Sequence, residues 1–270
     1  MSNFDTHLVT SFAGMFRQCF KVSSIDVSNF STSAATAMDY MFAYLYTIES
    51  LDVSNFVTTN LTKSNYMFYQ CRNIKSLDVH NFNMSKVTDI QYMFAGCYNL
   101  RSLNIHGWNM PLLTICRNLV ESCCTLEDFD MDNTVVGSAE DNPFKVTNCF
   151  NSVFYNMFRI KKVDLSGWNL GDLPAVFASV FRYDYQLEEV IMPTSYKQIG
   201  ATTFDGCRNL RKLVLPRTSV VVLDNVNAFN TTPSDKIIYV PDNLVSSYQT
   251  ANVWKNLTGI TFAGISTLTN

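Results

Sequence analysis

The chain has 270 residues, of which 47% are hydrophobic, 13% aromatic and 16% charged, with a formal net charge of -3. This composition is too rich in core-forming residues for a disordered chain, and without a basic run the sequence offers no electrostatic footprint for nucleic acid. No stretch approaches the roughly 18 apolar residues of a membrane span, and residues 1–20 lack the basic start and apolar run of a secretion signal. We therefore expect a folded chain with no nucleic-acid partner and no membrane span.

The first half of the chain repeats itself at a constant period. The segment Ser-Ile-Asp-Val-Ser-Asn-Phe and its relatives begin at Ser24, Ser50, Ser76 and Ser102, and a Met-Phe pair recurs in step at Met15, Met41, Met67 and Met93. Self-similarity at a fixed period of this length is typical of a solenoid, in which each unit buries its apolar side against its neighbours.

Each repeat contains a short segment of alternating apolar and polar residues, which predicts one short strand per coil. Stacked coils then form a parallel sheet with a spacing of about 4.8 Å. We expect Leu51 and Val53 to be buried, with Leu77 and Leu103 of the following coils stacked beside them. The alternate residues Ser50, Asp52 and Ser54 are expected to face solvent.

Apolar residues before each Met-Phe pair follow a helical spacing, as at Val87, Ile90, Met93 and Phe94. This spacing predicts a short helix, or a run of helical turns, behind each strand.

The period changes along the chain. The step from Phe129 to Val163 is longer than the equivalent step from Leu103 to Phe129, and the surplus surrounds 137–144, whose composition is that of an exposed loop. The later steps, to Val190, Leu213 and Ile238, are unequal, and a proline follows the strand at Pro193, Pro216 and Pro241. We expect a single solenoid over 1–262, made of 26-residue repeats over 1–175, shorter repeats over 176–236 and a closing segment over 237–262, followed by a tail at 263–270.

Several of these segments carry a family resemblance. Tyr92-Met-Phe-Ala-Gly-Cys-Tyr-Asn-Leu100, together with the Leu-Asp-Val-Ser-Asn-Phe segments, resembles the 26-residue BspA-type leucine-rich repeat of bacterial surface proteins and lipoproteins. Residues 203–216 are similar to the 23-residue version, and residues 238–254 look like the closing segment of such arrays. The resemblance implies a right-handed α/β leucine-rich-repeat solenoid, without catalytic activity or cofactor, that serves in adhesion or recognition.

The outward column at the centre of the strands is acidic: Asp26, Asp52, Asp78, Asn104, Asp130 and Asp164. Carboxylates stacked at this spacing repel by roughly 1 kcal/mol per pair in water. They therefore need hydroxyl or backbone donors, a cation or a basic partner, and the column is a candidate both for a structural role and for binding.

Two other outward columns are candidate binding residues. His80 and His106 share one position in neighbouring coils, where two imidazoles can share a metal or a carboxylate or simply be solvated, although two ligands alone make no metal site. A column that alternates between aromatic and basic residues is of the kind that interfaces favour, or is an ordinary turn surface. It is formed by Phe20, Tyr46, Arg72, Tyr98, Arg159, Tyr185 and Arg208.

Eight cysteines occur without a Cys-x-x-Cys pair, so zinc is poorly supported and no metal is expected. Side chains on stacked coils point in parallel, which suits packing better than bridging, so Cys71, Cys97 and Cys123 are predicted to be free thiols in one column. Trp108 and Trp168 replace a core phenylalanine. No nucleophile elbow, phosphate loop, dinucleotide fingerprint or His-Glu-x-x-His motif is present, and we predict no enzyme activity.

The chain opens inside a repeat, which leaves Phe4, Val9, Phe12 and Phe16 without an upstream neighbour. We expect this first coil to belong to an interface or to continue into further sequence. The leading interpretation is a recognition or adhesion module that binds protein or glycan on a cell surface, placed at the surface or secreted as part of a longer bacterial protein. The alternative is a structural subunit of a larger assembly, such as a phage virion.

Overall fold

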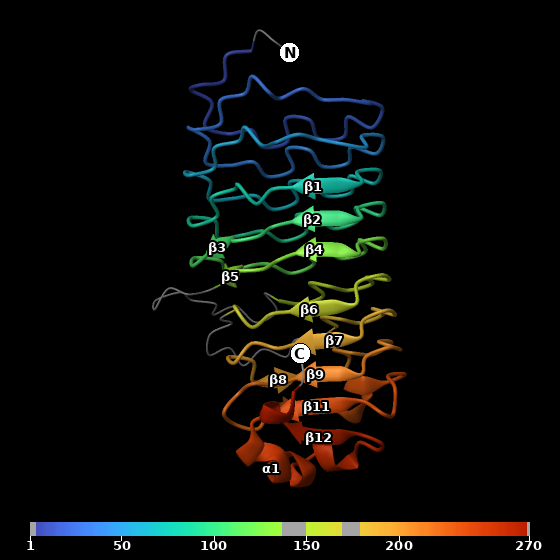
Figure 1. Ribbon diagram of the computed structural model, residues 1–270. Coiled ribbons are helices and arrows are strands. Elements are labelled where there is room, and N and C mark those ends of the chain that lie inside the picture. The colour runs from blue at the N-terminus through green and yellow to red at the C-terminus, as the bar shows by residue number, and fades with distance from the viewer. Residues whose placement is uncertain (1–3, 137–149, 169–178, 269–270) are drawn as a thin grey trace.

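The computed structural model describes residues 4–136, 150–168 and 179–268, and the loop expected at 137–144 lies outside these ranges. The chain winds into an elongated stack of coils, with the N-terminal coil at one end and the helix α1 at the other (Figure 1). Every strand pair is parallel. The expected parallel-strand solenoid is confirmed.

The main column of strands, which we call the strand side, is divided into two sheets. The first sheet has the order β1-β2-β4, and the second β12-β11-β9-β7-β6. Their bounds are β1 Ser76–Asp78, β2 Ser102–Asn104, β4 Asp128–Asp130, β6 Lys162–Asp164, β7 Glu189–Ile191, β9 Lys212–Val214, β11 Ile237–Val240 and β12 Thr261–Gly264. Leu77 lies opposite Leu103, as expected, and Leu103 lies opposite Phe129.

The alternation of burial along the strand side is confirmed. Leu51 and Val53 are 8% and 1% exposed, whereas Ser50, Asp52 and Ser54 face solvent. The coils that begin at Ser24 and Ser50 keep most of this alternation without forming paired strands, which start at β1. Burial fixes which side chains turn inward, whereas strand pairing also requires aligned backbone groups.

A second, shorter set of parallel pairs runs along another side of the solenoid. It consists of β3 Asn109–Met110 with β5 Val135–Val136, and β8 Gln198–Ile199 with β10 Val222–Leu223. Isolated bridges join Ser11, Ala37, Lys63, Asp89 and Ile115 in series. These contacts tie successive coils together away from the strand side.

Successive turns, and not short helices, lie behind the strands in the described repeats, except at Val226–Phe229, where a short 3-10 helix occupies the same place. The amide of Met15 donates to Phe12 (3.1 Å) and that of Arg17 to Gly14 (3.0 Å), which are single-turn bonds. Residues with positive φ recur at two positions of each coil, such as Tyr40 (56°) and Tyr44 (65°), and they interrupt any helix. Of the two alternatives in the prediction, the short helix is therefore wrong for these coils.

Stacked aromatic rings fill the core. Phe16, Phe42, Phe68 and Phe94 stack in series at centroid distances of 5.6, 5.6 and 5.7 Å. Trp108 and Trp168 are 1% and 3% exposed, so their core position is confirmed. Each coil thus shares its core with the next, as a solenoid requires.

A buried threonine column, which the sequence reasoning missed, joins the first coils. The Thr32 hydroxyl donates to the Val57 carbonyl (3.1 Å) and accepts from the Val57 amide (2.7 Å). Thr6 and Thr58 make the same pair of bonds to Ser31 and Asn83. Each hydroxyl thus pairs two backbone groups of the following coil.

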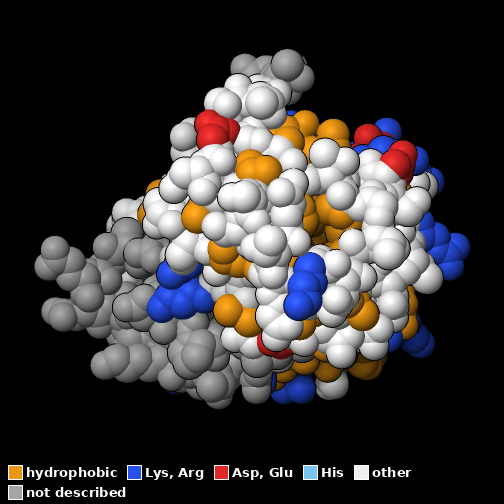
Figure 2. Space-filling view, turned by 90° about the horizontal axis from the view of Figure 1, so that it is seen from below, with side chains coloured by type: hydrophobic (Ala, Val, Ile, Leu, Met, Phe, Trp, Pro, Cys, Tyr) orange, Lys and Arg blue, Asp and Glu red, His pale blue; other side chains and the backbone are white. Residues whose placement is uncertain are grey.

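The C-terminal end is covered by the helical part of the chain. Its elements are η1 Val226–Phe229, η2 Asp242–Leu244, α1 Val245–Thr250, η3 Trp254–Asn256 and η4 Ile265–Thr267. Buried Tyr248 and Trp254 join this C-terminal segment to the last repeat through Val221. The Tyr248 hydroxyl accepts a hydrogen bond from the Val221 amide (2.9 Å), and the Trp254 indole donates one to the Val221 carbonyl (2.7 Å). From outside, this end mixes polar, basic and apolar side chains (Figure 2).

Candidate binding surfaces

Each residue of the acidic column lies at the C-terminal end of its strand segment, as Asp78 does in β1 and Asp164 in β6. Each of these side chains accepts a hydrogen bond from the backbone N–H two residues later, which makes an Asx turn. The bonds run from Ser28 to Asp26 (3.0 Å), Ser54 to Asp52 (2.9 Å), His80 to Asp78 (3.2 Å), His106 to Asn104 (2.9 Å), Asp132 to Asp130 (3.1 Å) and Ser166 to Asp164 (2.9 Å). This geometry supports a structural role, and a binding role for the column stays a prediction.

Hydrogen bonding also explains how neighbouring carboxylates of the column stay ionised. Bonds from the Ser28 hydroxyl and amide lower the pKa of Asp26, and those from Ser54 lower the pKa of Asp52. The local donors therefore favour the ionised form of these two carboxylates.

The two histidines contact carboxylates and do not form a metal cluster. His80 Nδ1 lies 2.6 Å from Asp78 Oδ1 in its own coil, and His106 Nδ1 lies 3.4 Å from Asp130 Oδ1 in the next. Within the described ranges no three His, Cys, Asp or Glu side chains come together as metal ligands. His80 and His106 thus extend the hydrogen bonding of the acidic column.

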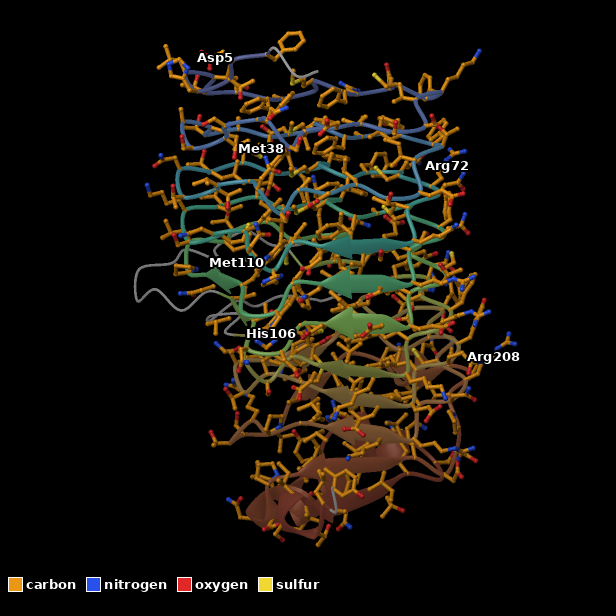
Figure 3. The ribbon with its side chains drawn as sticks, turned by 45° about the horizontal axis from the view of Figure 1, so that its top comes forward. Asp5, Met38, Arg72, His106, Met110 and Arg208 are labelled. Atoms are coloured by element: carbon orange, nitrogen blue, oxygen red, sulfur yellow. The ribbon has the colours of Figure 1, made fainter. Side chains whose placement is uncertain are left out.

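The aromatic and basic column is continuous through four coils. The Phe20 and Tyr46 rings lie 4.9 Å apart, and the Arg72 guanidinium lies 4.1 Å from the Tyr46 ring and 5.8 Å from the Tyr98 ring. Arg72 and Arg208 project along the same edge of the solenoid (Figure 3).

The assignment of Arg159 to this column is wrong. Phe158 occupies the position and stacks on Tyr185 at 5.2 Å, whereas Arg159 forms an ion pair with Glu127 at 2.6 Å. Counted from Phe154, the column position falls on Phe158, so the predicted repeat register was one residue too far along the chain. This coil directly follows the irregular step in the repeat.

Sequence reasoning missed a second aromatic column beside the first. Tyr40, Tyr66 and Tyr92 are half-buried and stack at centroid distances of 4.5 and 4.8 Å with nearly parallel rings. Tyr69 packs edge-on against Tyr66 (5.2 Å), and Tyr44 packs edge-on against Tyr69 (5.2 Å).

The two columns form one surface, which we call the tyrosine face. The centroids of the Tyr44 and Tyr46 rings lie 6.3 Å apart. The Arg72 guanidinium donates a hydrogen bond to the Gln70 side-chain oxygen, and the Gln70 side-chain amide donates to the Tyr69 hydroxyl. The face consists of Tyr40, Tyr44, Tyr46, Tyr66, Tyr69, Tyr92 and Tyr98, with Arg17 over the Tyr40 ring and Arg72 between the Tyr46 and Tyr98 rings. Because stacking and hydrogen bonds hold these side chains, the face presents a rigid, amphipathic surface.

A signal for the second column was present in the sequence. Tyr40, Tyr66 and Tyr92 share their repeat position with Gly14 and Asn118, and all five have φ between 55° and 67°. A glycine at one end of a column of tyrosines and an asparagine at the other indicate a left-handed backbone, in which a bulky residue is unusual.

Partly buried acids border the tyrosine face. Burial raises the pKa of Asp39, Asp89 and Glu121, and Arg117 donates to Gln91 at 2.8 Å near the same edge. Desolvation likewise raises the pKa of Tyr66 to about 12, so its phenol remains neutral and able to donate a hydrogen bond at physiological pH.

The first coil exposes several apolar side chains. Phe4 is 58% exposed, Leu8 77% and Phe20 42%, while Phe12 and Phe16 pack into the core. That this coil takes part in an interface, or continues into further sequence, stays a prediction. No helix in the described part of the chain has the length and apolar character needed to cross a membrane.

A family match over the second half of the chain agrees with the repeat architecture. Residues 1–77 and 47–149 match the family described as Mycoplasma protein of unknown function, DUF285, and residues 138–230 and 175–270 match the family described as BspA type leucine rich repeat region (6 copies). None of the curated proteins matches the chain. The crystal structure of a leucine-rich repeat protein from Bacteroides ovatus ATCC 8483 is similar with 15% identity and a TM-score of 0.42, over 92% of this chain and 70% of that one. The chain therefore belongs, through residues 1–149, to the family described as Mycoplasma protein of unknown function, and its residues 138–270 match the BspA type leucine-rich repeats.

Proposed function

We propose that this chain is a non-enzymatic recognition module that binds a protein ligand through the tyrosine face. Leucine-rich repeats build extended interaction surfaces from several coils at once. The observation that carries the proposal is the continuity of the face, in which seven tyrosines and two arginines lie in mutual contact over successive coils.

Two physical features support a protein ligand. Tyrosine and arginine are enriched at the centres of protein interfaces, because they combine large contact areas with directed hydrogen bonds. The stacked rings are also held in place before binding, so little side-chain entropy is lost on association.

The backbone conformation of three of these tyrosines also supports a binding role for the tyrosine face. Tyr40, Tyr66 and Tyr92 adopt positive φ, which costs roughly 1–2 kcal/mol for a residue with a Cβ atom. Gly14 and Asn118 show that residues with less strain at positive φ fit the same backbone position. Residues held in costly conformations are a recognised indicator of function.

We place the ligand on a bacterial cell envelope, with this module at the surface or secreted as part of a longer protein. The BspA-type repeats are the basis of that placement. The assembly alternative has only the exposed apolar residues of the first coil in its favour.

The test uses the immobilised chain and bacterial envelope fractions. Wild-type protein is compared with Tyr66→Asn, which suits the left-handed backbone, and with Tyr69→Ala. Tyr155→Ala is the matched control, because Tyr155 occupies the same repeat position as Tyr69 but lies outside the tyrosine face. We expect Tyr66→Asn and Tyr69→Ala to reduce capture at least about tenfold, as for interface hot spots, and Tyr155→Ala to leave it unchanged.

Treatment of the envelopes identifies the ligand class. Loss of capture after protease digestion supports a protein ligand. Capture that survives protease but is lost after periodate oxidation assigns the face to a glycan and overturns the protein proposal. Equal capture by wild-type protein and both tyrosine-face variants contradicts the role of the face itself.

A further inference from the structure

Between β1 and β12, the backbone bonds that join neighbouring coils on the strand side are interrupted once among the described residues. At one repeat position in this part of the column, the amide of a coil donates to a carbonyl of the next, whereas the equivalent amides of Val27 and Val53, in the coils before β1, make no such bond. These bonds are Val79 to Asn104 (3.0 Å), Ile105 to Asp130 (2.9 Å), Leu165 to Ile191 (2.9 Å), Met192 to Val214 (3.0 Å) and Leu215 to Tyr239 (2.8 Å). Met131 holds the same position between Ile105 and Leu165, and its amide makes no bond to β6.

The interruption leaves two strand edges facing each other. The amide of Asp128 donates to Arg101 and the carbonyl of Asp130 accepts from Ile105, so these residues of β4 turn their backbone groups toward β2. Backbone groups alternate in direction along a strand, so Phe129 and Met131 turn theirs away from β2, toward β6.

The same reasoning fixes the opposite edge. The carbonyl of Lys161 accepts from Glu189 and the amide of Leu165 donates to Ile191, so residues 161, 163 and 165 face β7. Lys162 and Asp164 therefore direct their backbone groups toward β4.

A cleft of about 940 Å³ lies between these edges, lined on one side by Phe129 and Met131 and on the other by Ile160, Lys162 and Asp164. The two strands lie farther apart than the paired strands of the same column (Figure 1).

The coils remain joined elsewhere. The amide of Val120 donates to Val153 (3.0 Å) on the turn side, and Val136 bridges to Trp168 on another side. The cleft is thus an opening of the strand side alone.

Most basic residues of the cleft are already paired. Arg159 contacts Glu127 (2.6 Å), Lys161 contacts Glu188 (3.3 Å) and Lys162 contacts Glu189 (3.4 Å). The other lining acids, Asp128, Asp132 and Asp164, contact no basic side chain among the described residues. The cleft therefore favours a basic group in its occupant.

We propose that the cleft accepts one extended segment of a partner protein as an additional strand between β4 and β6. Strands in a sheet lie about 4.8 Å apart, and unpaired edges supply directed donors and acceptors for an added strand.

The walls specify the composition of the segment. Its inward side chains are apolar and lie between Phe129 and Ile160, and the alternate outward side chain is Lys or Arg, near Asp132 and Asp164. This proposal does not depend on the tyrosine face, which lies on the turns.

The test uses a short capped peptide in which valine and lysine alternate. Binding to the isotopically labelled full chain is followed by NMR, together with the exchange of single amides with solvent. We expect binding to slow the exchange of the Met131 and Lys162 amides. A peptide methylated on alternate backbone nitrogens should bind at least about tenfold more weakly, since it loses backbone hydrogen bonds of roughly 1 kcal/mol each.

Charge is tested separately from backbone pairing. Asp164→Asn keeps the acceptor for the Ser166 amide, as Asn104 does for His106 in its own coil. We expect this variant to bind the peptide about two- to fivefold more weakly, as for the loss of a surface ion pair. Asp26→Asn, which makes the same change in a coil away from the cleft and keeps the acceptor for the Ser28 amide, should bind as the wild type does.

Three results would overturn the proposal. The first is the absence of any peptide-dependent change at the Met131 and Lys162 amides, and the second is equal binding of the methylated peptide. The third is a dimer of the chain that protects the same amides without peptide, which would assign the cleft to a second copy.

Discussion

We expect the stability of this solenoid to depend on pH through Asp184, the one fully buried carboxyl group among the described residues. Asp184 is fully buried at the position where Cys123 and Cys207 stand in other coils. One of its oxygens accepts from the Met157 amide (2.7 Å), and the other has no hydrogen-bond partner among the described residues. Burial therefore raises the pKa of Asp184 well above its usual value.

The sign of the pH effect follows from that shift. The folded chain holds the Asp184 proton more tightly than the unfolded chain, so stability falls as pH rises above the ordinary aspartate pKa. We expect Asp184→Asn, which keeps an acceptor for Met157, to raise the melting temperature at pH 7 and to lose this advantage toward pH 4. Melting curves across that range check the prediction, and a variant less stable than the wild type at pH 7 would contradict it.

The buried threonines make a separate contribution at the residue scale. Thr32→Val keeps the shape of the side chain but leaves the amide and carbonyl of Val57 without their partner. We expect a loss of about 1–2 kcal/mol in the free energy of unfolding, measured in urea. Exposed Thr59→Val serves as the control and should change stability by less than about 0.5 kcal/mol.

At the scale of the repeat element, the thiol column is fully reduced where it is described. Cys71, Cys97 and Cys123 are free, as predicted, and each thiol donates to a phenylalanine carbonyl of the preceding coil at 3.1–3.2 Å. Cys149 lies outside the described residues. A column of thiols thus satisfies backbone carbonyls inside the core.

These thiols should be unreactive until the chain unfolds. Burial raises the pKa of Cys71 and Cys123, which reduces the thiolate fraction that reacts with alkylating reagents. We expect little labelling of Cys71, Cys97 and Cys123 at pH 7.5 in the native protein and complete labelling in denaturant without reductant, read by mass spectrometry. Any of the three that stays unlabelled in denaturant would reveal a disulfide.

A substitution in the column of Tyr40, Tyr66 and Tyr92 can separate ligand binding from the stability of the fold. Tyr66→Asn removes three ring contacts, worth roughly 0.5–1.5 kcal/mol each, but it relieves the strain of a bulky residue at positive φ, which is about 1–2 kcal/mol. We expect the free energy of unfolding in urea to fall by no more than about 2 kcal/mol while ligand capture falls. A large loss of stability would show that the column chiefly supports the fold.

The sequence predicts the elements unevenly, for physical reasons. Alternation at Leu51 and Val53 reports burial directly, so the strand side and its facing residues were predictable. The tyrosine face was only half predictable, because ring stacking between Tyr40 and Tyr66 depends on a left-handed backbone that hydrophobic spacing does not encode. The Asx turns of the acidic column arise from local bonds at Asp52 and its equivalents, which composition alone does not distinguish from a ligand site.

At the scale of the whole molecule, the irregular step in the repeat was visible in the sequence but its consequence was not. The long step from Phe129 to Val163 predicts extra chain. It does not predict that β4 and β6 separate while the coils stay joined at Val120 and Val136, because that depends on how the coils stack in three dimensions.

Hydrogen exchange of the free protein, resolved to single amides, tests this account most directly. Its central claim is one continuous solenoid whose paired strands, from β1 to β12, separate among the described residues only between β4 and β6. Exchange should be slow, by at least about tenfold relative to Met131, wherever the repeated bond between coils is made. Those amides are Val79, Ile105, Leu165, Met192 and Leu215. Slow exchange at Met131, equal to that of Ile105 and Leu165, would show a closed strand side and contradict the account.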